Sequence, residues 1–371
     1  MLPRLAAEVA EDRLSSALVQ DLYPMVQSRA ESGAASGPSM SKRSDSPMLR
    51  VLCRTPGQVS AACRLTWLPE IVLDFLEVQG LKEAVQEVQR AGKRAVVATP
   101  RVLKPDEQRL LAFYLRVGAD ALLVRSTGLL HQLLGLGGSG APVPAELVPG
   151  GSARVPQLEG DFSLNAANAV SADLLLSCGL DRLTPTHDLN AVQLCELAEG
   201  LGSRGGRLEA VLHQHLPVFH TEYCAFCRFL STGSNYKDCG HPCESTTLHL
   251  RDGEGKDHLV LADMGCRNTV FSAVAQSGLR HWRELLAAGY RAFRVELVDE
   301  PADVVAPLME AYRDVLEGRR GWREVWSFLG TLPDANGRKH GVNEGSLAVI
   351  GEQAKEARKE TAYQKKTAGL A

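Results

Sequence analysis

The sequence predicts an α/β fold, a TIM-like (β/α)8 barrel with a long cysteine-bearing insertion between strands seven and eight. Three observations support this prediction. Short runs rich in Val, Leu and Ile alternate with amphipathic stretches, which is typical of parallel strands joined by crossover helices. There are eight such runs, as many as a TIM barrel has strands. The interval between the last two runs is far longer than one helix requires.

The elements follow one another in a regular order. The predicted strands span residues 50–54, 70–76, 94–99, 120–126, 156–164, 182–189, 207–214 and 292–298. The predicted helices span residues 80–92, 104–118, 190–202, 281–290 and 301–318. A doubly wound open sheet is the rival architecture. However, the stretch after the first strand, "RTPGQVS", lacks the glycine fingerprint of a dinucleotide-binding fold.

Three regions divide the chain. Residues 1–48 are expected to form an N-terminal helix and a flexible linker, because residues 27–48 are rich in Ser, Gly and Ala. Residues 49–335 are expected to form the barrel domain, with the insertion at 220–280. Residues 336–371 are polar and charged, and we expect a frayed tail there.

Composition excludes several classes of protein. The 371 residues are 44% hydrophobic and 23% charged, an ordinary globular profile with material for a large core. The formal net charge of −3 gives no global basic field for nucleic acid, although a local basic face remains open. No apolar run reaches the roughly 18 residues that a membrane span needs, so we expect no membrane partner.

The beginning of the chain bears on location. It lacks a basic region followed by an apolar core, so we expect no secretory signal. The acidic residues Glu8, Glu11, Asp12 and Asp21 argue against an organelle transit peptide in the first 25 residues. We therefore expect an intracellular protein, in the cytoplasm or in an organelle stroma or matrix, where thiols stay reduced.

A dense group of cysteines lies in the insertion. Cys224, Cys227, Cys239 and Cys243 form C-x2-C and C-x3-C pairs eleven residues apart, and Cys266 follows after 22 more. Thiolates are soft ligands suited to zinc or to iron–sulfur clusters, and the spacing alone favours metal or cluster binding without separating the two. Unliganded thiols and a disulfide pair remain alternatives. The cysteines elsewhere, Cys53, Cys63, Cys178 and Cys195, are expected to be small core residues.

Polar residues at the predicted strand ends are the other candidates, because barrel active sites form there. The catalytic candidates are His187, His213, His220, Glu222 and Glu296. Further polar residues at these ends are Asp161, Asn165, Asn168, Asp188 and His215.

Each of these positions also has a structural interpretation. Asp188 has the sequence context of a helix N-cap, and Asn165 that of a turn residue. His213 and His215 share a strand face and are equally compatible with hydrogen bonds inside a core. His220 and Glu222 adjoin the cysteines and could orient them.

Several motifs resemble one known family. The stretch "LPVFHTEYCAFCRFLSTGSNYKDCGHPCE" is similar to the signature of the collagenase-like peptidase family numbered thirty-two among those of unknown catalytic type. Further matching stretches occur in the expected order: "VATPRVLKPDE", "GDFSLNAANA", "LTPTHDLN", "HLVLADMGCRNTVF" and "FRVELVDEPADVV". The resemblance covers about residues 48–350. The family's usual opening, "APAGN", is absent, and "CRTPGQVSAA" is the nearest counterpart.

The resemblance implies a TIM-like barrel and a four-iron–four-sulfur cluster on four cysteines. Matching the motifs gives Cys224, Cys239, Cys243 and Cys266 as ligands, with Cys227 as the spare thiol and zinc as the lesser alternative. Some relatives support oxygen-independent hydroxylation of RNA bases or of the ubiquinone ring, and others carry a protease label.

Three hypotheses for function follow. The first is an iron–sulfur protein that supports hydroxylation of RNA, tRNA or rRNA, or of a related substrate, with an unknown electron or oxygen donor. The second is a peptidase acting on proteins, although neither a GxSxG nor an HExxH motif is present. The third is a non-catalytic, metal-stabilised scaffold. A basic rim for RNA would draw on seven residues: Arg101, Lys104, Arg125, Arg228, Lys237, Arg267 and Arg294.

Overall fold

The computed structural model of the chain describes residues 47–104, 107–149, 153–332, 339, 341–349 and 351. The predicted N-terminal helix and nearly all of the predicted linker lie outside these residues, as does most of the predicted tail. Residues 342–347 of that tail are described. They form a short strand and a turn of 3-10 helix against the main sheet rather than a frayed end.

Eight parallel strands form the body of the main sheet, and each falls where the sequence predicts one. They run in the order β7-β13-β1-β2-β3-β4-β5-β6. Their bounds are β1 Met48–Cys53, β2 Glu70–Leu73, β3 Arg94–Ala98, β4 Ala121–Val124, β5 Gln157–Gly160, β6 Arg182–Leu183, β7 Glu209–Gln214 and β13 Ala292–Glu296. At the β7 edge, β12 (Ala275–Ser277) pairs antiparallel with β7, and β14 (Val342–Asn343) pairs with β12.

The main sheet is strongly curled. A single parallel bridge between Leu183 and Leu208 joins β6 to the residue before β7, the two ends of the parallel set. The α/β class is therefore confirmed. The complete eight-stranded barrel is not, because β6 and β7 share one bridge in place of a ladder of hydrogen bonds.

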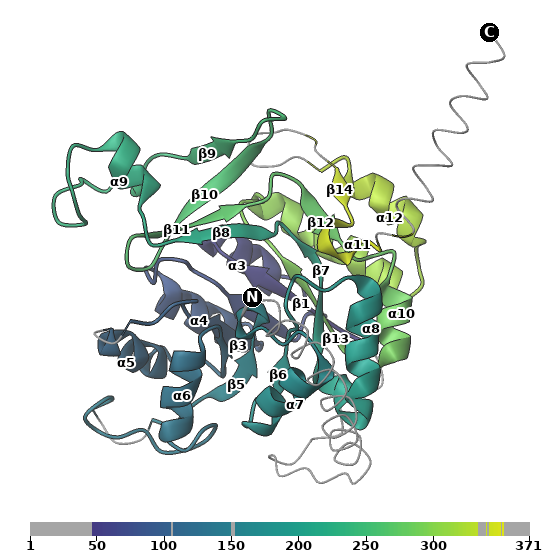
Figure 1. Cartoon of the computed structure of the whole chain (residues 1–371), viewed down its shortest axis with the longest axis horizontal. Helices are drawn as coiled ribbons and strands as arrows, with labels where there is room; N and C mark the ends of the chain where they lie inside the picture. The colour runs from purple at the N-terminus through teal and green to yellow at the C-terminus, as the bar shows by residue number, and fades with distance from the viewer. Residues whose placement is uncertain are drawn as a thin grey trace, which may run out of the picture.

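Helices cover the outside of the curled sheet (Figure 1). Their bounds are α3 Pro56–Cys63, α4 Leu81–Arg90, α5 Gln108–Arg116, α6 Thr127–Gly135, α7 Ala169–Ser177, α8 Ala191–Gly200, α10 Trp282–Ala288, α11 Ala302–Leu316 and α12 Trp322–Leu329. All five predicted helices are present. The main hydrophobic core lies between these helices and the outward-facing strand residues, such as Val51, Ile71 and Val97. No described helix has the length and apolar character needed to cross a membrane.

Helix starts and turns follow local chemistry. The N-cap of α8 is Asn190, whose side chain accepts from the Gln193 amide while the Gln193 side chain accepts from Asn190 N–H. The prediction that Asp188 caps this helix is wrong. Asp188 lies two residues too early and accepts from the Thr186 hydroxyl instead. Asn165 sits at φ 59° just after a 3-10 turn, which agrees with the turn interpretation.

A network of buried ion pairs fills part of the inside of the curl. Arg50 on β1 binds Glu70 on β2 at 2.9 Å and Glu159 on β5 at 2.6 Å, and it also binds Glu209 on β7. The full network, called the interior ion network below, comprises Arg50, Glu70, Arg94, Glu159, Arg182, Glu209 and Arg294. Strands β1 and β5 are four places apart in the sheet, so these contacts are possible only because the sheet curls with this face inward.

Electrostatics keep the network ionised despite its burial. Burial alone would raise the pKa of Glu159, but the charges of Arg50, Arg182 and Arg94 hold this pKa below its ordinary value. Burial would likewise lower the pKa of Arg50, and the surrounding glutamates raise it instead. Each charge is therefore compensated by partners on other strands.

The insertion builds a second, antiparallel sheet at one end of the molecule (Figure 1). Its order is β8-β11-β10-β9, with bounds β8 Pro217–Thr221, β9 Leu248–Arg251, β10 Asp257–Asp263 and β11 Arg267–Phe271. Between β8 and β9 lie α9 (Ala225–Leu230) and the 3-10 turn η4 (Pro242–Glu244). Residues 217–271 are called the cysteine module below.

The two faces of the small sheet meet different partners. On the inner face Leu259 and Phe271 pack with Leu76 and Val298, from loops that follow β2 and β13. On the outer face Val260 and Val270 pack with Phe226, with Cys224 and Cys243 at the margin. The module is therefore anchored at the carboxyl ends of the parallel strands.

We expect Arg50→Met to lower the free energy of unfolding by about 3–5 kcal/mol, because it removes the one cation shared by three buried glutamates and leaves them with excess negative charge. Urea unfolding followed by circular dichroism measures the change. The control is Arg90→Met on the exposed face of α4, where Arg90 bonds only the Gln86 carbonyl, with an expected change within about 0.5 kcal/mol. Equal losses for both variants would contradict a central role for the network.

Candidate functional site at the carboxyl ends of the strands

Charged side chains meet where the parallel strands end. Arg125, just after β4, binds Asp74 after β2 at 2.6 Å and Asp161 after β5 at 2.7 Å. Arg294 reaches the other Asp161 oxygen at 2.6 Å and Glu296 at 2.8 Å. Together with Arg54, Arg101 and His187, these residues are called the strand-end cluster below. The position agrees with the general placement of active sites at this edge of parallel α/β sheets.

A stacked column borders this cluster. The His187 ring stacks on Phe162 with centroids 3.8 Å apart, and the Arg101 guanidinium lies 4.8 Å from the Phe162 centroid on the same column. Gln214 Nε2 lies 3.3 Å from His187 Nδ1. With the amide in this orientation it donates to Nδ1, which leaves the ring proton on Nε2.

Burial holds His187 in its neutral form. It lowers the pKa of His187 to about 4, against the opposing charges of Glu296 and Asp161. His187 Nε2 is buried and has no hydrogen-bond partner among the described residues. At neutral pH it therefore presents one unused N–H donor.

A second histidine belongs to a relay on the inner face of the cysteine module. His220 Nδ1 lies 3.0 Å from Thr269 Oγ1, which in turn lies 3.2 Å from Asp263 Oδ2. Antiparallel pairing sets this geometry, because Thr269 on β11 is directly opposite His220 on β8. The direct His220–Asp263 separation of 3.7 Å is too long for a hydrogen bond, so Thr269 mediates the contact.

The relay fixes which nitrogen of His220 carries the proton. An ionised Asp263 can only accept, so Thr269 donates to it and accepts from His220 Nδ1–H, which leaves Nε2 as a lone-pair acceptor. Burial, then the charges of Arg101 and Arg267, lower the pKa of His220 to about 4. Burial raises the pKa of Asp263 to about 6, and the negative charge of Asp74 adds to the effect of burial. His220 Nε2 is also buried without a partner, so it can accept a proton from a bound molecule.

The remaining catalytic candidates lie in different surroundings. Glu296 joins the strand-end cluster. His213 does not, because its Nδ1 is 2.9 Å from the Tyr312 hydroxyl in a buried network that also contains Ser277. His215 Nδ1 bonds the Ser272 carbonyl. His213 therefore matches the core interpretation.

Glu222 is half exposed and accepts from Arg267 Nε at 2.8 Å. Its pKa is lowered, and the largest cause is a hydrogen bond from Lys104. Burial opposes this effect, and a hydrogen bond from Arg267 adds to it. Of the residues expected to form a basic rim, Arg125, Arg267 and Arg294 are instead buried and paired. Arg228 and Lys237 are exposed.

The five cysteines of the module gather around two of their number. The pKa of Cys266 is raised by burial and then by the thiolate charges of Cys224, Cys239 and Cys227. Cys224 and Cys239 also act on Cys243, after burial. In Cys227, burial is again the largest cause of the raised pKa, followed by Cys239 and Cys224. Cys224 and Cys239 therefore lie at the centre of the group, and all five thiols are free.

Glycines allow the cysteine loop to fold on itself. A Cβ at Gly233 would lie 2.4 Å from the Asp238 carbonyl oxygen, so only glycine permits this close approach of backbones beside Cys239. The Cys227 thiol donates to the Gly233 carbonyl at 3.5 Å. Cys266 sits at φ 60° in the turn between β10 and β11, a left-handed conformation that turns its side chain out of the ladder.

The donor set fits a thiolate-bound metal or cluster in kind and number. Four or five free thiols on loops with glycine hinges are what such a centre requires. Among the residues that the structure describes, no three His, Cys, Asp or Glu side chains are close enough together to hold a metal ion as they stand. Binding would therefore draw the thiolates of the loop closer to one another.

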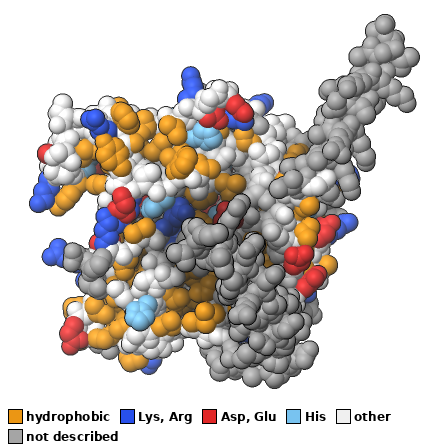
Figure 2. All heavy atoms as spheres, viewed as in Figure 1, with side chains coloured by type: hydrophobic (Ala, Val, Ile, Leu, Met, Phe, Trp, Pro, Cys, Tyr) orange, Lys and Arg blue, Asp and Glu red, His pale blue; other side chains and the backbone are white. Residues whose placement is uncertain are grey.

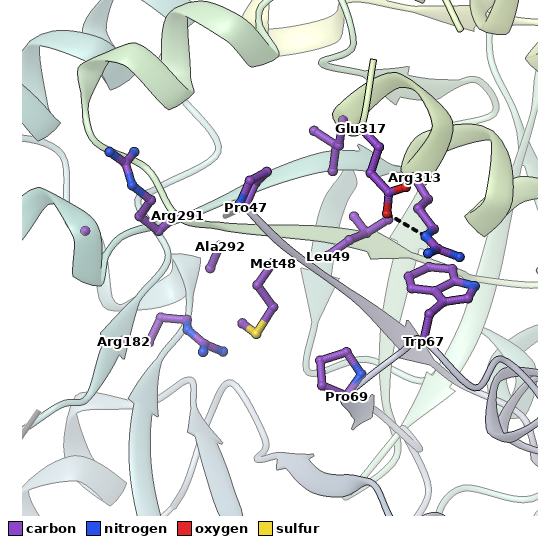
Figure 3. Close-up of a pocket in the computed structure, with 12 residues that line it drawn as sticks. Pro47, Met48, Leu49, Trp67, Pro69, Arg182, Arg291, Ala292, Arg313 and Glu317 are labelled. Carbon is purple, nitrogen blue, oxygen red and sulfur yellow. Dashed lines mark hydrogen bonds and ion pairs between the residues drawn. The ribbon is translucent and has the colours of Figure 1, made fainter. Parts of the chain in front are cut away.

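One described cavity lies at the opposite end of the strands. It measures about 760 Å³ and is lined by Met48, Leu49, Trp67 and neighbouring residues (Figure 3). Arg313 there pairs with Glu317 at 2.7 Å and lies over the Trp67 ring. Because these polar groups already have partners, we place the chemistry at the strand-end cluster and not in this cavity.

Sequence reasoning missed two parts of the site. Asp263 and Thr269 were not candidates, because their relation to His220 depends on strand pairing across 49 residues. Arg101 was expected only as a rim cation. A usable signal for the charged interior was a single charged residue within an apolar strand, such as Arg50 in "MLRVLC".

Comparisons with known proteins bear on the family and the fold. The model of peptidase family U32 matches residues 155–325. No curated protein matches the chain.

Similar solved structures are distant. Chitinase ChiW from Paenibacillus sp. str. FPU-7 is 12% identical with a TM-score of 0.36, over 73% of this chain and 33% of that one, so this chain spans about a third of its length. The HpcH/HpaI aldolase from Desulfitobacterium hafniense DCB-2 is 10% identical with a TM-score of 0.35, over 74% and 94% of the two chains. An uncharacterized B. cereus protein is 11% identical with a TM-score of 0.30, over 71% and 65%.

We expect Asp263→Asn to change the pH dependence of stability. A carboxyl whose folded pKa is raised to about 6 stabilises the fold at low pH and loses that contribution as pH rises through 6. Relative to wild type, the variant should therefore gain about 1 kcal/mol of unfolding free energy between pH 5 and pH 7. Urea unfolding at both pH values measures this, and a difference that stays constant would contradict the assignment.

Proposed function

Because this chain belongs to peptidase family U32, with residues 155–325 matching its model, we propose that it is an iron–sulfur protein supporting oxygen-independent hydroxylation of RNA bases or a related substrate. The observation that supports the proposal most is the group of five free thiols beside the strand ends. Free thiols also favour a reducing, intracellular setting.

We propose Cys224, Cys239, Cys243 and Cys266 as the ligands of a four-iron–four-sulfur cluster. Cys224 and Cys239 are central because each acts on the other three thiols. Cys227 is the spare, since its thiol already donates to the Gly233 carbonyl. When bound, such a cluster supplies one-electron transfer.

The chain's own residues would handle binding and protons. His220 Nε2 is an unused acceptor, His187 Nε2 an unused donor, and both belong to the strand-end region. Glu77, in the loop after β2, acts electrostatically on Cys243 and Cys266, which supports a short path between the thiols and this region. We propose, too, that the eight parallel strands close into a TIM-like barrel through the Leu183–Leu208 bridge, with their ends sharing one mouth.

The surface of the cysteine module supports RNA as the partner. Most of the exposed large hydrophobic side chains of the described residues lie here: Val218, Phe219, Tyr223, Phe229, Leu230, Tyr236 and Leu250. Hydrophobic side chains gather over this small sheet in Figure 2. Exposed cations accompany two of the aromatics: Arg228 precedes Phe229 in the sequence, and Lys237 Nζ lies 5.9 Å from the Tyr236 ring. Aromatic rings with adjacent cations suit the stacked bases and phosphates of single-stranded RNA.

Peptidase activity has weaker support. A serine- or threonine-type peptidase needs an accessible hydroxyl beside a base. The hydroxyl that meets His220 belongs to Thr269, which is 3% exposed and is held in the β11 ladder. Tyr312 and Ser277, beside His213, are also buried.

Anaerobic purification with iron, sulfide and zinc analysis tests the centre. We expect about four irons and four sulfides per wild-type chain, and a loss of most of both in Cys239→Ser. The matched control is Cys178→Ser, outside the module on the C-cap of α7, which should keep the wild-type content. Zinc without sulfide would favour the scaffold. Casein or gelatin cleavage that survives Cys239→Ser would favour the peptidase.

Binding of a single-stranded RNA oligonucleotide tests the partner. Combined Phe229→Ala and Tyr236→Ala should weaken binding at least tenfold, since each stacked base is worth about 1–3 kcal/mol. Leu174→Ala is the control, because Leu174 on α7 is 65% exposed but lies outside the module. Fluorescence anisotropy gives the dissociation constants. Equal weakening by the control, or no weakening by the aromatic pair, would count against RNA at this surface.

A further inference from the structure

Arg101 differs from the other arginines of the strand-end cluster. Arg125 contacts two carboxylates and Arg294 contacts three. Arg101 makes no hydrogen bond or ion pair with any residue that the structure describes, and its Nη1 atom is buried without a partner. Its one close contact is the face of the Phe162 ring at 4.8 Å.

An unpaired guanidinium in such a place is unfavourable. Arginine stays charged in proteins, and burying a charge without a counter-ion costs free energy. The pKa of Arg101 is lowered first by burial and then by the charge of Arg125, whereas the paired Arg125 has a raised pKa. The fold thus holds a cation that no described carboxylate contacts directly.

The nearby carboxylates are already engaged. Asp161 is shared between Arg125 and Arg294, and Asp74 between Arg125 and Arg54. Asp263 accepts from the Met264 amide and the Thr269 hydroxyl. These carboxylates influence Arg101 from a distance, but none is paired with it. No carboxylate in the described part of the chain therefore serves as the counter-ion of Arg101.

A second unused donor lies on the same column. His187 stacks on Phe162, and its Nε2 has no partner. Arg101 and His187 both lie against the Phe162 ring, and the charge of Arg101 acts on His187 and on His220, so the three side chains are within electrostatic range of one another. Arg101, His187 and His220 are each partly exposed as whole residues, while the three unpartnered nitrogen atoms are buried.

We propose that Arg101 and His187 form a binding site for an anionic oxygen group, a carboxylate or a phosphate, on a ligand of the strand-end cluster. The guanidinium supplies the positive charge and N–H donors, and His187 Nε2–H supplies one more donor. His220 Nε2, an acceptor, faces the same ligand and can take a proton from it. The site does not depend on whether the cysteines hold a cluster, so the two proposals fail independently.

Such a group has two sources, a small free anion or a phosphate of RNA. Thermal unfolding of the full chain, purified without added metal, separates them at constant ionic strength. The probes are inorganic phosphate, malonate and a short single-stranded RNA oligonucleotide. A ligand that binds only the folded state raises the midpoint temperature of unfolding, and the rise grows with the logarithm of the ligand concentration. A free anion predicts a shift with phosphate or malonate. An RNA phosphate predicts a shift with the oligonucleotide alone.

The variants Arg101→Gln and Arg101→Lys test the residue itself. We expect Arg101→Gln to weaken binding of the effective probe at least tenfold and Arg101→Lys to weaken it less, because lysine keeps the charge but not the fork of donors. Without a probe, Arg101→Gln should unfold at the wild-type temperature or above, since it removes an unpaired cation. Arg125→Gln should unfold at a lower temperature, since it removes one of the two arginine partners of both Asp74 and Asp161.

The matched control is Arg283→Gln, because Arg283 is an exposed arginine over the ring of Trp282 on α10. It should bind every probe as wild type does. The proposal is overturned if none of the probes shifts the wild-type midpoint, or if Arg101→Gln binds the effective probe as tightly as wild type. It is also overturned if Arg101→Gln fails to fold or loses as much stability as Arg125→Gln, which would assign Arg101 a structural role.

Discussion

The contact of Arg50 with glutamates on three other strands holds the curled sheet together from the inside. Arg50 on β1 reaches Glu159 on β5 and Glu209 on β7, and no flat sheet would let it do so. Because buried charges tolerate little displacement from their partners, the network fixes the curl as well as the identity of the inward face. The carboxyl ends of the strands are thereby brought near one another, and the candidate site exists only for that reason.

The chain uses buried arginines in two ways. Within the curl and through Arg125 they are matched by carboxylates, so that their charge contributes to a defined structure. At Arg101 none of the described residues supplies a counter-ion, and a buried charge without one is unfavourable. Violations of ordinary polar pairing concentrate at functional sites, where a ligand completes the interaction. The contrast between Arg101 and Arg125 is therefore more informative than the presence of either alone.

The cysteine module joins two kinds of chemistry through one small sheet. Its inner face carries His220, Thr269 and Asp263, and packs on loops at the strand ends. Its outer face and loops carry the thiols. One strand pairing, β8 with β11, positions both sets. The electron-transfer centre that we propose and the proton acceptor His220 would lie on the two sides of one sheet, an arrangement suited to a reaction that moves both electrons and protons.

The sequence by itself determined the elements and the chemistry available to them. Apolar periodicity located eight strands and five helices, because burial on one face is a local pattern, and the spacing of thiols marked the module. Only the tertiary structure decided that His187 and His220 face the strand ends while His213 lies in a buried network with Tyr312. The same holds for the relay through Thr269, the unpaired state of Arg101 and the cap at Asn190. Each depends on strand register, on the curl of the sheet or on whether a partner lies within reach. These are relations between distant segments of the chain, and they leave no periodic pattern in the sequence.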